Sequence, residues 1–130
     1  MEEARVSFET AKLLKEKGFK GQGEYFYENN KIIDLTNYWH RITPEQRYEA
    51  IEAPTLQTVM AWLREVHRLF VHIGIYRDQD GNSSDYNYWN WWIDDVNTTL
   101  TIAENECIIP YETYEEACEA AIKYCLEHLI

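Results

Sequence analysis

The seven residues from Tyr86 to Trp92 hold three of the chain's five tryptophans and two of its ten tyrosines. Successive side chains of a β-strand point to opposite faces, so this run places large rings on both faces of a sheet. A helix that covers one face leaves rings on the other. The second face is then either core for another part of the chain or a surface for a partner or ligand. The candidate interaction surface comprises Tyr86, Tyr88, Trp89, Trp91 and Trp92.

The flanking residues predict an antiparallel sheet around this run. Residues 70–77 alternate apolar positions with a second set that includes Phe70 and His72, which predicts a strand. Turn-forming residues fill 78–84, so the aromatic strand is expected to return beside it. Residues 98–102 are rich in β-branched side chains and predict a third strand.

Helix signals occur at three places. Ser7 precedes an amphipathic stretch over 8–17 that Gly18 ends, a second stripe follows Thr55, and Thr113 opens a capping box before a helix that runs to Leu129. Before the second stripe, Asn29 and a second asparagine predict a hairpin turn between strands at 25–27 and 31–35, and 43–50 predict a helical turn or two.

These elements predict an α+β fold in a single domain over 1–130. Its small antiparallel sheet has about three strands, with helices packed on one face. The C-terminal half follows the order helix–strand–strand–(strand)–helix, and the N-terminal half supplies a helix and a hairpin. The N-terminal half, or nothing, covers the second face of the sheet.

The composition of the chain limits the kinds of partner and the cellular compartment that we expect. Twelve basic against 23 acidic residues give a net charge of −11, which repels nucleic-acid phosphates and excludes direct nucleic-acid binding. No apolar stretch reaches bilayer length and no secretory signal is recognisable, so we expect a cytoplasmic protein without a membrane partner. The odd count of three cysteines indicates reduced thiols.

The motifs predict no enzyme chemistry. Cys125 and His128 share a helix face, but no spacing typical of metal ligands accompanies them. Asp94 and Asp95 are adjacent on a strand and so point to opposite faces. We expect no catalytic residues, no cofactor-binding residues, no metal ligands and hence no cofactor.

Four segments resemble short, uncharacterised phage- and prophage-related proteins of gut anaerobes: Val6–Phe19, Ala53–Gln57, Trp62–His67 and Tyr114–Ala117. Together they comprise 29 of the 130 residues. The C-terminal half is also loosely similar to the α-β-α sandwich domain of some phage proteins. The resemblance implies an origin and a fold, and it implies no catalytic position.

The leading hypothesis is a non-enzymatic, phage- or prophage-derived accessory protein that binds another protein, or itself, through the aromatic sheet face. One alternative is a small-molecule or glycan-binding module that uses the same rings. Another is an acidic mimic that inhibits a DNA-binding protein, and it requires carboxylates arrayed on one surface. The oligomeric state stays open. The carboxylates in question are Glu104, Glu106, Glu112, Glu115, Glu116 and Glu119.

Overall fold

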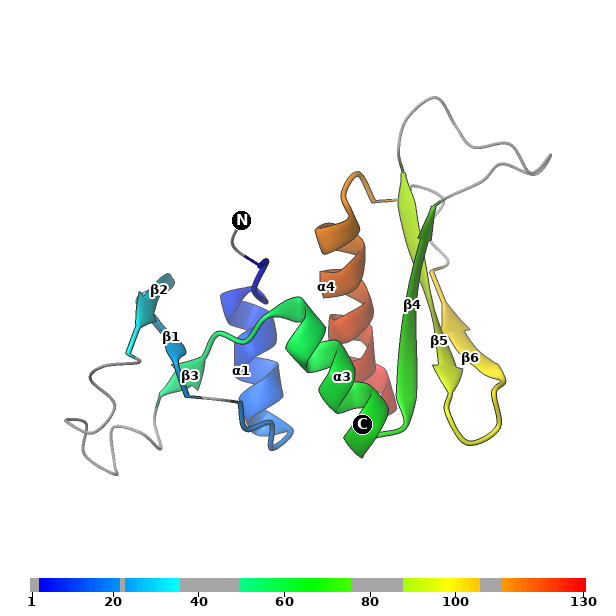
Figure 1. Ribbon diagram of the computed structural model, residues 1–130, viewed down its shortest axis with the longest axis horizontal. Helices are drawn as coiled ribbons and strands as arrows, with labels where there is room; N and C mark the ends of the chain where they lie inside the picture. The colour runs from blue at the N-terminus through cyan, green and yellow to red at the C-terminus, as the bar shows by residue number, and fades with distance from the viewer. Residues whose placement is uncertain (1–2, 22, 36–49, 76–87, 106–110) are drawn as a thin grey trace. The chain divides into compact units, whose positions relative to one another are not determined.

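The computed structural model describes residues 3–21, 23–35, 50–75, 88–105 and 111–130 (Figure 1). By their internal contacts these residues form two compact units, Met1–Thr58 and Val59–Ile130. The described residues form three α-helices and two small antiparallel sheets of three strands each, which confirms the α+β class. The aromatic run belongs to the second unit.

The first unit begins with helix α1, Phe8–Glu16. Ser7 caps it as predicted, because its hydroxyl accepts a hydrogen bond of 3.3 Å from the backbone N–H of Thr10. Gly18 follows with φ +86°, a left-handed conformation that glycine adopts without steric cost. Both ends of this helix are therefore set by local chemistry.

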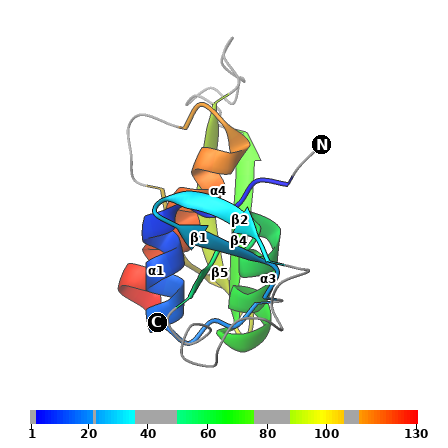
Figure 2. The ribbon, with the colours of Figure 1, turned by 90° about the vertical axis from the view of Figure 1, so that its left-hand side faces the viewer.

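The first unit also holds the sheet β2-β1-β3, whose strands β1 and β2 face the viewer in Figure 2. Strands β1 (Tyr25–Glu28) and β2 (Lys31–Asp34) form the predicted hairpin, and both turn residues, Asn29 and Asn30, have positive φ. Strand β3 (Ile51–Glu52) was not predicted. The helical turns predicted at 43–50 lie, apart from residue 50, outside the described residues.

Helix α3, Leu56–Val66, starts in the first unit and continues into the second. The predicted cap is present, since the hydroxyl of Thr55 accepts from the backbone N–H of Thr58 at 3.2 Å. Within the second unit the predicted apolar stripe is buried at Val59, Met60 and Leu63, whereas Val66 at its end is 60% exposed. A seven-residue strand follows directly.

The sheet of the second unit has the order β4-β5-β6, all antiparallel. Strands β4 (Leu69–Ile75) and β5 (Trp89–Asp95) pair as the alternation predicted. Strand β6 spans Thr101–Glu104, three residues later than the start predicted at residue 98. The carboxylate of Asp95 accepts from the backbone N–H groups of Asn97 and Thr98, and this turn delays the strand.

Helix α4, Tyr114–Tyr124, packs on β4 and β5 along one side of the sheet (Figure 1). Thr113 caps it by accepting from the backbone N–H of Glu116 at 3.0 Å, as the capping box predicted. The predicted α-helix to Leu129 ends early, because Cys125–Leu129 forms the π-helical segment η2. Small residues bring α4 close to the sheet: Ala117, Cys118 and Ala121 are fully buried.

No helix among the described residues is long and apolar enough to cross a membrane. The buried side of the second sheet is centred on Ile93, whose side chain is 0% exposed. It is paired with Val71 on β4.

Replacing Ile93 tests this core. We expect Ile93→Ala to lower the free energy of unfolding by about 2–5 kcal/mol, because it leaves a cavity below α4. Urea denaturation followed by far-UV circular dichroism measures the change. Ile102→Ala is the matched control, since Ile102 is 45% exposed and its loss should cost well under half as much. Equal losses would contradict this placement of the core.

Candidate functional site

The register between β4 and β5 sorts the aromatic residues onto two faces. Trp91 lies opposite Ile73, while Trp92 lies opposite His72 on the other face. Directly opposed residues of an antiparallel pair point to the same side. Trp91 and Ile73 therefore share one face of the sheet, and Trp92 and His72 share the other.

The helix-covered face holds two of the candidate tryptophans. Trp89 contacts Tyr114 edge-to-face at 5.5 Å between ring centroids, and Trp91 contacts Tyr124 at 5.1 Å. Trp91 is only 5% exposed. Such aromatic pairs contribute about 0.5–1.5 kcal/mol beyond the area they bury. These two rings serve the packing between β5 and α4.

The opposite face carries a stack of three rings, Phe70, His72 and Trp92, which we call the aromatic ladder. The His72 and Trp92 rings are nearly parallel, with 4° between planes and 5.0 Å between centroids. Phe70 follows at 4.5 Å from His72, and the guanidinium of Arg64 lies 5.6 Å from the Phe70 ring. Phe70 is 38% exposed and the other two rings are half-buried. The ladder is thus an ordered, partly solvent-exposed apolar strip.

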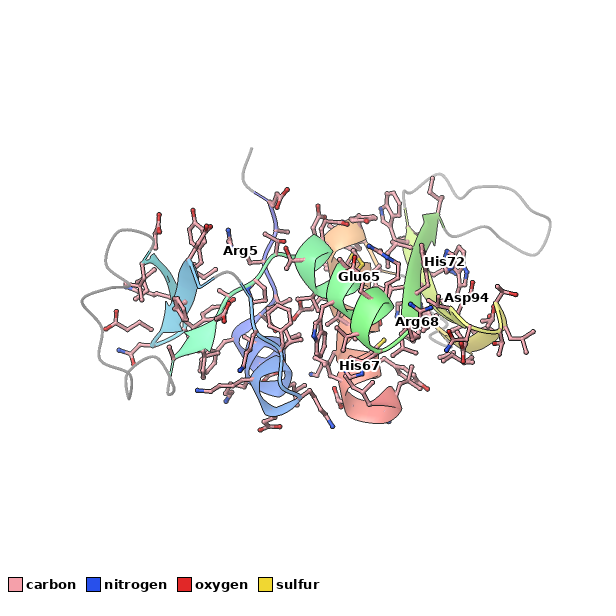
Figure 3. The ribbon with its side chains drawn as sticks, turned by 60° about the horizontal axis from the view of Figure 1, so that its bottom comes forward. Arg5, Glu65, His67, Arg68, His72 and Asp94 are labelled. Atoms are coloured by element: carbon pink, nitrogen blue, oxygen red, sulfur yellow. The ribbon has the colours of Figure 1, made fainter. Side chains whose placement is uncertain are left out.

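Polar contacts hold the ladder in place (Figure 3). His72 Nε2 lies 2.8 Å from Asp94 Oδ2, and the Thr101 hydroxyl donates to Asp94 Oδ1 at 2.7 Å. A nucleophile needs a hydrogen bond to its base, but here the hydroxyl and the imidazole both contact the carboxylate rather than each other. This trio orients side chains from three strands and lacks the geometry of a catalytic triad.

Gly74 makes room for the ladder. A Cβ atom at this position would lie 2.8 Å from Cζ3 of Trp92, closer than real Cβ contacts. The missing side chain allows the Trp92 ring to lie flat over the strand.

The candidate surface is divided by the structure. Tyr88 directly precedes β5 and is half-buried, and Tyr86 lies outside the described residues. Trp89 and Trp91 face α4, which leaves Trp92 on the other side. The sequence did not lead us to predict that Trp92 lies beside Phe70, His72, Gly74 and Asp94. The signal was present, because the alternation in 70–77 already placed the first three on one face.

Two of the three cysteines are described, and both are free and buried. Burial raises the pKa of Cys118 to about 11 and that of Cys125 to about 12. Cys107 lies outside the described residues. No group of three or more His, Cys, Asp or Glu side chains within the described ranges is arranged to hold a metal ion.

Comparison with models of known protein families, with curated proteins and with solved structures finds no match to this chain.

The raised thiol pKa values predict a pH dependence of stability. In the folded protein both thiols keep their protons at pH values above 9.0, which is the ordinary pKa of a cysteine thiol. The folded state then binds more protons than the unfolded state, so the free energy of unfolding falls as pH rises from about 9 towards 11. Urea titrations across this range test it. The double variant Cys118→Ala, Cys125→Ala should show a shallower fall, and an identical slope would contradict the prediction.

Gly74→Ala should displace the Trp92 ring and leave the fold intact, because the new methyl group clashes only with the far end of the Trp92 side chain. We expect a stability change within about 1 kcal/mol. The His72 ring protons should lose the upfield shift that a stacked indole imposes, as measured by NMR. Trp92→Ala defines the full size of that shift. Unchanged His72 resonances in Gly74→Ala would contradict the stacking geometry.

Proposed function

We propose that this chain is a non-enzymatic accessory protein of phage or prophage origin that binds a basic segment of another protein through the aromatic ladder. The phage or prophage origin rests on the sequence resemblance alone. The observation that carries the binding proposal is the parallel stack of His72 on Trp92 on the sheet face opposite α4. Solvated rings held in fixed positions are typical of protein-binding surfaces.

The charge of the protein favours a basic partner. The chain carries a net charge of −11, and the carboxylate of Asp94 lies beside the ladder with a side-chain exposure of 22%. Lysine and arginine side chains are attracted to indole faces, and a negative field raises their rate of encounter. A second copy of this chain carries the same negative charge, so self-association is disfavoured electrostatically.

The exposed area is modest, which favours a short segment over a broad interface. Phe70 is the one exposed ladder residue, His72 and Trp92 are half-buried, and the Arg64 guanidinium lies 5.6 Å from the centre of the Phe70 ring. A small apolar strip with flanking charge suits a transient contact in which one or two anchor side chains dominate the affinity. Trp92 and Asp94 are the expected anchors.

A short, unstructured lysine–serine peptide tests the proposal directly. We expect saturable binding by isothermal titration calorimetry. Trp92→Ala should weaken it by about 3- to 30-fold, because it removes the ring that receives the cation. Asp94→Asn should also weaken it. Circular dichroism verifies that both variants stay folded.

A charge-matched control separates the ladder from the general acidity of the chain. Glu65→Gln removes one negative charge at an exposed position of α3 and should leave the affinity within about twofold of the wild type. Equal losses in Glu65→Gln and Asp94→Asn, together with wild-type affinity in Trp92→Ala, would contradict the proposal. Self-association that Trp92→Ala abolishes would instead identify a second copy as the occupant.

A further inference from the structure

A second feature of β5 lies on its helix-covered side, where a cavity of about 650 Å³ opens between strands β5 and β6 and helix α4 with segment η2. Its lining residues include three aromatic ones, Trp91, Tyr111 and Tyr124, together with Ile102 and Ala120. This volume is within the range of pockets that hold small organic ligands. The ladder lies on the opposite face of the sheet, so the two sites are independent.

Trp91 adds a specific reason to expect a ligand. Its side chain lines the cavity at 5% exposure, and its Nε1 is buried with no hydrogen-bond acceptor among the described residues. Buried donors are nearly always satisfied, because an unmade hydrogen bond forfeits the solvation of the group. Less than 1 Å² of Nε1 is exposed, so the indole must turn slightly toward the cavity for an acceptor atom of a ligand to receive this N–H.

Charges at the cavity indicate the ligand's own charge. Lys123 lines it together with Glu104 and Glu127, so charges of both signs are present. Such a lining favours neither a strong anion nor a strong cation. The rings favour a flat molecule that can stack on them.

We propose that this cavity binds a small, uncharged, planar heteroaromatic compound whose ring acceptor receives a hydrogen bond from Trp91 Nε1. The aromatic walls supply the stacking surface and the indole N–H supplies orientation. The site requires no partner protein and no residue of the aromatic ladder.

Quinoline and naphthalene form a matched pair of probes, because they share one shape and differ in a ring nitrogen that accepts a hydrogen bond. Titration of ¹⁵N-labelled protein with quinoline should shift the Trp91 indole N–H resonance saturably. Trp91→Phe assigns that resonance by its disappearance. Naphthalene should bind about 3- to 10-fold more weakly, which is the worth of one hydrogen bond.

Two variants make the test decisive. Ala120→Leu fills part of the cavity and should weaken quinoline binding at least about tenfold, whereas Glu65→Leu adds the same side chain outside it and should have no effect. In Trp91→Phe the two probes should bind alike, because the donor is gone. No saturable shift at Trp91, or full affinity in Ala120→Leu, would overturn the proposal. Equal binding of both probes to the wild type would overturn the role of the indole N–H.

Discussion

The antiparallel register between β4 and β5 is the constraint on which the rest of the second unit depends. It pairs Val71 with Ile93 on the buried side and His72 with Trp92 on the other. A slip of one residue would turn every side chain of β5 to the opposite face. Trp92 would then replace Trp91 beneath α4, and His72 would lose Asp94. Burial of Ile93 at 0% exposure makes that slip costly.

One strand thereby carries two different kinds of aromatic surface. On the α4 side, rings fill the space between helix and sheet and border a cavity at Trp91. On the other side, rings stack along the sheet and remain half-exposed. The two polar contacts that join His72 and Thr101 to Asp94 fix the second surface without supplying a nucleophile. The proposals for a basic protein segment and for a planar small molecule each use one of these faces.

Local chemistry made much of the fold predictable from the sequence. Capping residues such as Ser7 and Thr113, and the turn at Asn29, act on backbone groups within a few positions, and each does so in the structure. Strand β3 was missed, because two residues carry no periodicity and pair with β1 across a long gap. The late start of β6 depends on Asp95. The sequence did not predict the aromatic ladder, because its side chains come from two strands. Only the pairing of those strands determines which side chains lie next to one another.

Fluorine NMR of protein labelled with 5-fluorotryptophan tests the two-faced strand most directly. Each signal is assigned by a single tryptophan-to-phenylalanine variant, and the shift between H₂O and D₂O reports solvent contact at each ring. Our account predicts a clear solvent shift for Trp92 and almost none for Trp91. Equal protection of both rings, or a reversal of their order, would contradict the register of β4 on β5 and the open face built on it.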